Sequence, residues 1–206
     1  MRYARLMVIG LLAASRGQAQ QTPEPLRVAA SSFASVEVHL NSRMIGGKWY
    51  AEDAGLTGPP RVTITYGQPH ARGRQIVGGL IPNDAPWRFG ANEATTLATD
   101  VDLTLGGTTV AQGTYTLYLL HSKDAWQLLV NSSTRQWGTD YDASKTIARI
   151  PLTARTTAES EDALTIYLDP ESANPRSGYA ALAGALRIRW GTVELKTSWT
   201  IRAGAG

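Results

Sequence analysis

The chain has 206 residues, no cysteine and a formal net charge of +3, from 20 Lys and Arg against 17 Asp and Glu. The lack of cysteine excludes disulfides, iron–sulfur clusters, cysteine zinc sites and a cysteine nucleophile. A chain of this length can bury a core without cross-links, and it has room for one domain or two.

The first 19 residues have the pattern of a secretory signal peptide. Arg2 and Arg5 form a positive start, Leu6–Ala14 is a short apolar run, and Ala19 ends a small-residue cleavage site. The apolar run is far shorter than the ~20 residues that cross a bilayer, so we expect no membrane span. We therefore predict an exported protein, periplasmic or extracellular. Cleavage would remove three arginines and no acid, which leaves a near-neutral chain with no electrostatic case for nucleic acid.

The remainder alternates apolar and polar residues with the period of β-strands. After a flexible lead-in over 20–34, clear examples are 61–66, 101–105 and 193–202. About nine or ten short strands follow one another at the spacing of a sandwich, and no long segment has a helical period. We predict an all-β chain with little helix, folded over 35–202 as a single antiparallel β-sandwich of jelly-roll type.

Four local predictions accompany this fold. Segment 41–60 is expected to be a loop or a short hairpin. Gly106–Gly107 predicts a tight turn between two strands. Asp169–Pro170 is expected to end the strand over 164–168, because proline cannot donate to a ladder. The run 114–120 is apolar on both faces, which predicts a central strand that is covered on each side.

Several motifs resemble those of a bacterial exported family, the domain-of-unknown-function 2911 family, and the resemblance spans roughly 35–201. It implies an exported β-rich domain with no established activity, so it transfers no catalytic residues. The motifs are TYGQP (65–69), RGR with IVGGLIP (72–82), WRFGANEAT (87–95), GTYTLY (113–118) and QWGTDYD (136–142).

The glycine-rich middle of the chain holds three arginines that are candidates for a ligand site. Arg72 and Arg74 flank Gly73, so in an extended backbone both side chains leave the same side. Guanidinium groups match carboxylates, phosphates and sulfates in bidentate geometry, so these residues and Arg88 predict an anionic ligand. The alternative is that they bond carbonyls or acids within the protein, with Arg88 and Glu93 as an internal pair.

Glu93 is the residue that we consider for catalysis, as a general acid or base. On a strand it faces away from its neighbour Asn92. Catalysis on a glycoside needs a second carboxylate within about 5–10 Å, and Asp84, Asp100 and Asp140 are the candidates. The alternative is that Asn92 bonds a turn backbone and Glu93 neutralises an arginine.

The tryptophans divide into two groups. Trp190 and Trp199 lie on the apolar phase of strands and are predicted to be core. Trp87 and Trp137 lie in glycine-flanked loops, where an exposed tryptophan suits a sugar ring. The alternative is that each plugs one end of the sandwich.

No motif predicts a metal or a cofactor. The three histidines, His39, His70 and His121, are scattered and lack zinc-site spacing. The glycines precede no helix, as a phosphate loop would require, and there is no Gly-x-Ser-x-Gly nucleophile elbow.

Three functions remain open, and the sequence does not predict the oligomeric state. The first is a binding module for a small anionic or sugar-like ligand, the second is a secreted hydrolase that uses Glu93 with an arginine clamp, and the third is a structural component of an envelope assembly. The predicted ligand-binding residues are Arg72, Arg74, Trp87, Arg88, Asn92, Glu93, Tyr118 and Trp137.

Overall fold

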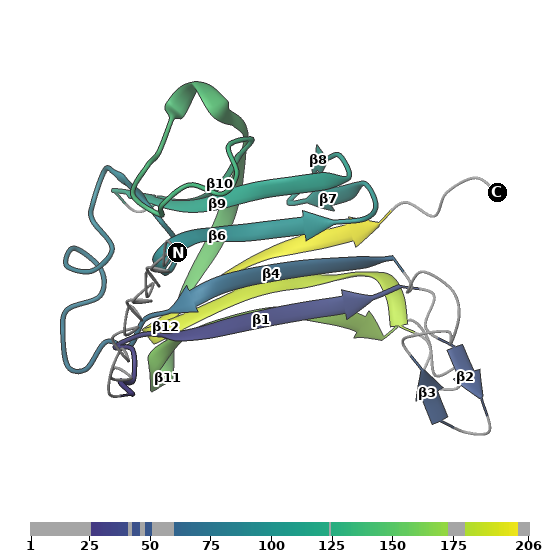
Figure 1. The fold of residues 1–206 in the computed structure, drawn as a ribbon, viewed down its shortest axis with the longest axis horizontal. Helices are drawn as coiled ribbons and strands as arrows, with labels where there is room; N and C mark the ends of the chain where they lie inside the picture. Colours follow the sequence, from purple (N-terminus) through teal and green to yellow (C-terminus); the bar gives the residue numbers. More distant parts are fainter. Residues whose placement is uncertain are drawn as a thin grey trace, which may run out of the picture.

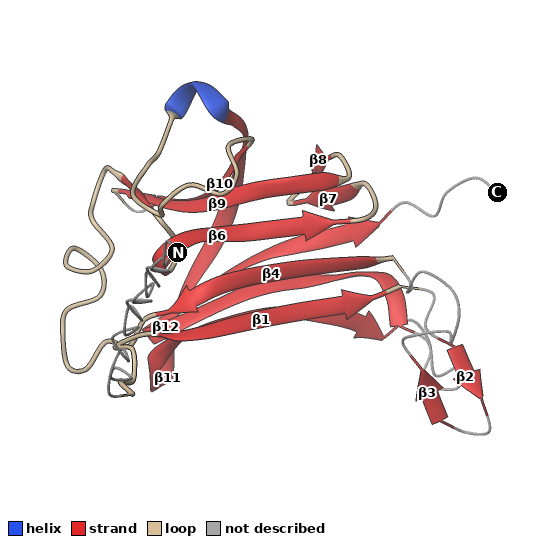
Figure 2. Ribbon diagram, in the orientation of Figure 1, coloured by secondary structure: helices blue, strands red, loops and turns tan. Residues whose placement is uncertain are grey.

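The structure is a computed structural model that describes residues 26–40, 43–45, 48–50, 60–123, 125–172 and 180–201. The predicted signal peptide lies outside these residues. Most of what is described is β-strand, and the one short helix, η1 (Ala143–Lys145), is a single 3-10 turn (Figure 2). Among the described residues, no helix is long and apolar enough to cross a membrane.

Ten strands form one antiparallel sheet, which confirms the predicted all-β fold. Their order in the sheet is β1-β4-β6-β9-β10-β11-β12-β7-β8, and β5 pairs with β9 beside this path. The remaining two, β2 and β3, form the hairpin expected within 41–60. The bounds are β1 Ser32–His39, β2 Arg43–Ile45, β3 Lys48–Tyr50, β4 Arg61–Gln68, β5 Pro86–Trp87, β6 Ala91–Thr99, β7 Leu103–Leu105, β8 Thr108–Val110, β9 Gly113–Ser122, β10 Ala125–Asn131, β11 Thr146–Ser172 and β12 Ala180–Ile201.

The predicted turn at Gly106–Gly107 is confirmed. Leu105 pairs with Thr108 across it, so the two glycines are the whole connection between β7 and β8. Their φ angles are 53° and 85°. Two successive positive φ angles are those of the type I′ turn, whose twist matches that of the strands.

Strands β11 and β12 are much longer than the sequence predicted, because segments expected to be separate strands are continuous. They pair as a two-stranded ribbon whose register shifts between Thr156 and Thr165. The ribbon turns back on itself at this irregularity (Figure 1), which gives a first limb (153–156 with 193–196) and a second limb (165–172 with 180–189). The predicted break at Asp169–Pro170 was wrong. Pro170 is paired with Gly184, next to a further register shift, and such irregularities are where sheets tolerate proline.

The core lies between two layers. One consists of β1, β4, β6, β9 and β10, and the other consists of the β11–β12 ribbon with β7 and β8. The inward side chains alternate along each strand, as predicted for a sandwich. The Tyr66 side chain extends across the core, and its hydroxyl accepts a hydrogen bond from the backbone N–H of Ile166 at 3.2 Å. This bond ties the middle of the first layer to the second limb.

The outer face of β9 and β10 is covered by the segment 132–145, which we call the covering loop. Tyr118 points outward from β9 and meets Tyr141 of this loop edge to face, with ring centroids 4.8 Å apart. Asn131 donates from Nδ2 to the carbonyl of Asp142 at 2.8 Å, which holds the far end of the loop. Residues 116–119 are therefore buried on both faces of the sheet, as predicted for a central strand, whereas Thr114 at the start of the run is exposed.

Candidate functional site

The predicted site residues do not converge on one cleft. They divide among the end of the sandwich, its core, and a groove on the outer face of the first layer.

Arg72 and Arg74 lie at the end of the sandwich, where they fix backbone. Arg72 Nη2 donates to the carbonyl of Ala30 at 2.6 Å. Arg74 donates from Nε to Ala71 O at 2.9 Å and from Nη2 to His70 O at 2.6 Å. Both therefore hold loop carbonyls, as the alternative interpretation of the arginines expected. The two are not on one side of an extended strand, because Arg72 and Gly73 have φ angles of 49° and 74° and form a turn.

Trp87 and Tyr118 are buried, so neither presents a face to solvent. Trp87 is 9% exposed and stacks on Trp190 with ring centroids 5.4 Å apart, which makes it part of the core. Tyr118 is 1% exposed, and its hydroxyl donates to Asp140 O at 3.3 Å. Burial raises the pKa of the Tyr118 phenol above its ordinary value, because the charged phenolate would be poorly solvated.

Arg88 and Glu93 do not form the internal pair that the sequence offered as an alternative, since no ion pair joins them in this part of the described chain. Arg88 Nε instead donates to the carbonyl of Gly90 at 3.1 Å. Asn92 has a φ of 62°, and its carbonyl accepts the N–H of Gly138 at 3.1 Å. Asn92 thus serves the backbone at a turn, while Glu93 is left exposed.

Glu93 and Trp137 come together on the outer face. They form an antiparallel bridge, flanked by hydrogen bonds from Gly138 N to Asn92 O and from Ala94 N to Gln136 O. The covering loop thereby adds a short piece of strand to the beginning of β6. This pairing fixes the position of Trp137, although its side chain remains 51% exposed.

The groove beside this bridge has a volume of about 580 Å³, and we call it the outer groove. That volume lies within the range of roughly 300–1,000 Å³ that small-molecule sites occupy. Its lining comes from β6, β9 and the covering loop: Glu93, Ala94, Thr96, Thr114, Thr134, Arg135, Gln136 and Trp137.

Short hydroxyl side chains form the surface onto which the outer groove opens. Ser35, Thr65, Thr96 and Thr116 are aligned across four neighbouring strands, from β1 to β9. Side chains at directly paired positions share one face of a sheet, so these residues form one row. Thr116 is covered by the loop, where its Oγ1 donates to Ser133 O at 2.7 Å. The other three lie on the side of the row that the loop leaves open.

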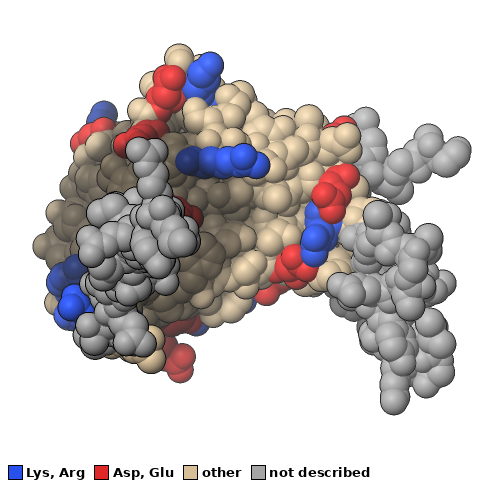
Figure 3. Space-filling view, viewed as in Figure 1, with Lys and Arg blue, Asp and Glu red and all other residues tan. Residues whose placement is uncertain are grey.

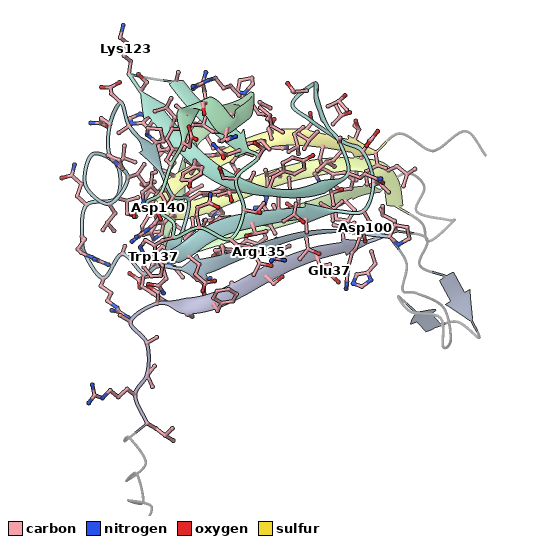
Figure 4. The ribbon with its side chains drawn as sticks, turned by 45° about the horizontal axis from the view of Figure 1, so that its top comes forward. Glu37, Asp100, Lys123, Arg135, Trp137 and Asp140 are labelled. Carbon is pink, nitrogen blue, oxygen red and sulfur yellow. The ribbon has the colours of Figure 1, made fainter. Side chains whose placement is uncertain are left out.

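The charge of this face is low and balanced. Figure 3 shows few Lys, Arg, Asp or Glu side chains over β4 and β6, apart from a group of both signs at the ends of these strands. That group includes Glu37, whose Oε1 lies 3.7 Å from Arg61 Nη1. Figure 4 shows Arg135 and Trp137 on the same side of the sheet as Glu37 and Asp100. The outer groove itself has Arg135 and Glu93, one charge of each sign.

Gln136 adds a polar group that lacks a partner. Its Nε2 donates to Thr116 Oγ1 at 3.1 Å and to Tyr118 OH at 3.3 Å, which orients the amide. Its Oε1 is buried and has no hydrogen-bond partner in the described part of the chain. A buried acceptor without a donor costs about 1–3 kcal/mol, and Gln136 Oε1 is such an acceptor on a residue that lines the groove.

A second and larger hollow, of about 840 Å³, lies between the two limbs of the ribbon. Sequence reasoning did not predict this hollow, because its lining residues are far apart along strands whose bending was not predicted. Arg187 lines this hollow and lies beside Glu194, whose side chain is only 4% exposed. Arg155 Nε lies 2.6 Å from one carboxylate oxygen, and Arg187 Nη1 and Arg189 Nε lie 3.6 and 3.9 Å from the other.

The charges of the network around Glu194 are neutralised within the protein. The hydrogen bond from Arg155 lowers the pKa of the Glu194 carboxyl, because it favours the charged form. Arg187 also bonds Asp169 at 2.7 Å and lies 4.3 Å above the ring of Tyr167. Glu194 comes from the first limb and Arg187 from the second, so this network holds the limbs together. We therefore assign it to the fold.

No group of three or more His, Asp or Glu side chains is placed to hold a metal ion among the residues that the structure describes. In comparisons with known proteins, the model of a family described as protein of unknown function (DUF2911) matches residues 52–198. No curated protein and no solved structure matches the chain.

Proposed function

The chain belongs to the DUF2911 family, and we propose that it binds a saccharide in the outer groove. The observation that carries this proposal is the half-exposed indole of Trp137, fixed by backbone pairing at the side of a groove that opens onto hydroxyl groups. The predicted signal peptide supports an exported binding module, and export is part of the proposal.

The groups in the groove complement a sugar ring. An indole face packs against the C–H groups of a pyranose, and a rigid aromatic side chain loses little entropy on binding. Glu93 offers a carboxylate that accepts hydrogen bonds from sugar hydroxyls. Gln136 Oε1 offers a buried acceptor, and Thr96 and Thr114 offer hydroxyls that both donate and accept.

A neutral sugar fits these groups better than an anion does. Two of the three arginines that predicted an anionic ligand are at the end of the sandwich, where they bond carbonyls. The third, Arg88, bonds Gly90 O. The single cation in the lining, Arg135, is matched by Glu93. A bound anion would therefore meet a groove with no excess positive charge.

The lining also favours binding over hydrolysis by Glu93. Glycosidases use a pair of carboxylates about 5–10 Å apart on either side of the scissile bond. Glu93 is the only carboxylate among the described residues that line the groove. A hydrolase that used Glu93 with an arginine clamp would need groups that the fold has placed elsewhere.

The test is titration of the protein with a panel of soluble oligosaccharides, followed by tryptophan fluorescence and calorimetry. Trp137→Ala should weaken binding at least tenfold with little change in melting temperature, because half of this side chain is already exposed. Phe33→Ala is the matched control, since Phe33 is 66% exposed and does not line the groove. Equal affinities of Trp137→Ala and wild type for a bound sugar would place the site elsewhere. No binding by the wild-type protein across the panel would reject the saccharide.

A further inference from the structure

A serine, a histidine and an aspartate are joined by hydrogen bonds at the end of the sandwich, away from the outer groove. Ser32 Oγ lies 3.3 Å from His70 Nε2, and His70 Nδ1 lies 3.2 Å from Asp162 Oδ2. The sequence analysis considered His70 alone. Ser32 and Asp162 are 38 and 92 residues away from it, so only the fold brings the three together.

The order of atoms in this series of hydrogen bonds is that of a hydrolytic triad. In such triads the serine hydroxyl faces Nε2, and the carboxylate bonds the opposite ring nitrogen, which fixes the tautomer that leaves Nε2 able to accept a proton. We propose that Ser32, His70 and Asp162 are nucleophile, general base and orienting acid in the hydrolysis of short-chain carboxylic esters. This inference does not depend on saccharide binding.

The three residues come from the start of β1, the segment that follows β4, and the irregular middle of β11. Ser32 begins β1, where it pairs with Gln68 of β4. The chain after β4 then runs antiparallel to β11, with hydrogen bonds from Ala71 N to Asp162 O at 2.7 Å and from Leu164 N to Pro69 O at 3.0 Å. His70 is therefore held by backbone pairing to β11, and its side chain reaches Ser32 at the start of β1.

Asp162 is held more firmly than its exposure alone suggests. Its carbonyl accepts the indole N–H of Trp190 at 2.9 Å, and its Oδ1 accepts the backbone N–H of Arg72 at 2.6 Å. The bond from the Arg72 N–H lowers the pKa of the Asp162 carboxyl, so Oδ2 faces His70 as a carboxylate at neutral pH. The turn at Arg72, with a φ of 49°, is what directs this N–H to the aspartate.

The hydroxyl proton of Ser32 has two acceptors. Gln68 Oε1 lies 2.9 Å from Ser32 Oγ, and the Gln68 amide is oriented by its bond from Nε2 to Leu164 O. Rotation about the Cβ–Oγ bond of Ser32 turns the same proton from Gln68 to His70 Nε2. The geometry thus holds a resting arrangement and a reactive one that differ by a hydroxyl rotation.

The site is open to a small substrate. The side chain of His70 is 32% exposed and that of Asp162 is 56% exposed. Arg72 Nη2 bonds the carbonyl of Ala30, two residues before Ser32, so its guanidinium is held near the start of β1. A cation with several N–H donors stabilises the negative charge that develops on the carbonyl oxygen. Ser32 is itself exposed at the start of β1, and an open surface of this kind favours short acyl groups.

The reaction is balanced with water as the only other reactant. Ser32 Oγ attacks the ester carbonyl carbon and forms a C–O bond, while its proton passes to His70 Nε2. The ester C–O bond breaks, and His70 gives the proton to the departing alcohol. Water then attacks the acyl-enzyme and passes a proton to His70. The carboxylic acid leaves as that proton returns to Ser32 Oγ.

The test uses the full chain, p-nitrophenyl acetate as the ester, and a fluorophosphonate, which phosphonylates activated serines with loss of fluoride. Wild type should hydrolyse the ester above the buffer rate and gain one adduct by intact mass, with the adduct on Ser32 in the peptide map. Ser32→Ala should lose the adduct, and both Ser32→Ala and His70→Gln should lower hydrolysis by about 10²–10⁴-fold. Ser35→Ala is the matched control, since Ser35 is an exposed serine on the other face of β1, and it should behave as wild type.

Two results would overturn the proposal. One is a wild-type protein that takes no adduct and hydrolyses no ester, which would leave the three residues as a clamp between β1 and β11. The other is hydrolysis by Ser32→Ala at the wild-type rate, which would assign any activity to a different nucleophile. Because the first result is read on the wild-type protein, it does not depend on whether a variant folds.

Discussion

Replacing Glu194 by glutamine removes a buried negative charge from between three guanidinium groups. The carboxylate is 4% exposed and lies 2.6, 3.6 and 3.9 Å from nitrogens of Arg155, Arg187 and Arg189. Breaking a buried ion pair costs about 3–5 kcal/mol, because the partner charge stays buried without compensation. Arg155 is 68% exposed, so solvent compensates its loss, and Arg187 keeps its bond to Asp169. We therefore expect a smaller loss, of about 2–3 kcal/mol.

A loss of this size lowers the melting temperature of a domain of this length by roughly 5–10 °C. Circular dichroism melts at pH 7 measure it. Glu159→Gln is the control, since Glu159 is exposed and contributes its carbonyl to the hydrogen bonds of the ribbon. The effect should depend on pH. The folded pKa of Glu194 is below its ordinary value of 4.5, so its stabilisation is present above that pH and is lost as the pH falls through the folded pKa. The wild-type advantage should therefore shrink in acid. A variant that melts with wild type at pH 7 would refute the view that this network joins the limbs.

Three further predictions concern packing and backbone conformation. Gly184→Ala should destabilise the protein by more than 2 kcal/mol, because the added Cβ would overlap the backbone carbonyl of Asp169. In chemical denaturation Gly107→Ala should cost less, about 1 kcal/mol, since its Cβ would meet nothing within 4 Å and only its φ of 85° is unfavourable. Trp87→Ala should lower the unfolding free energy by about 3–5 kcal/mol, since it leaves a cavity beside Trp190. A loss below 1 kcal/mol would contradict the core position of Trp87.

Alternation along single strands predicted the fold class well, because each strand has one face on the core and one in solvent. It predicted strand lengths poorly where the ribbon bends. The period-two pattern changes phase at Gly191, whose φ is 59° and which lies next to the register shift of β11. A change of phase in a sequence looks like a turn between two strands. Here it is an irregularity within one, and only pairing with the neighbouring strand distinguishes the two cases.

The candidate site was predictable in part. The pairing of Glu93 with Trp137 joins two motifs that sequence reasoning had marked, but nothing local showed that they were partners. The prediction that the side chains of Arg72 and Arg74 point to the same side was wrong for a local reason. Their shared direction assumed an extended backbone, whereas Arg72 has a φ of 49°. Ser32 was missed altogether, since a serine at the start of a strand has no pattern of its own.

The glycines of the marked motifs explain how architecture and site can share one stretch of sequence. A Cβ on Gly67 would overlap the carbonyl of Ala91, so glycine is needed where β4 approaches the beginning of β6. A Cβ on Gly138 would lie 2.7 Å from Asn92 O and 2.8 Å from Arg88 Cδ, so glycine is also needed where the covering loop joins β6. These close approaches set the backbone on either side of Glu93 and bring Trp137 beside it. Gly67 and Gly138 therefore determine whether the outer groove forms, although neither lines it. Substitutions at these two glycines should remove the groove together with the local fold.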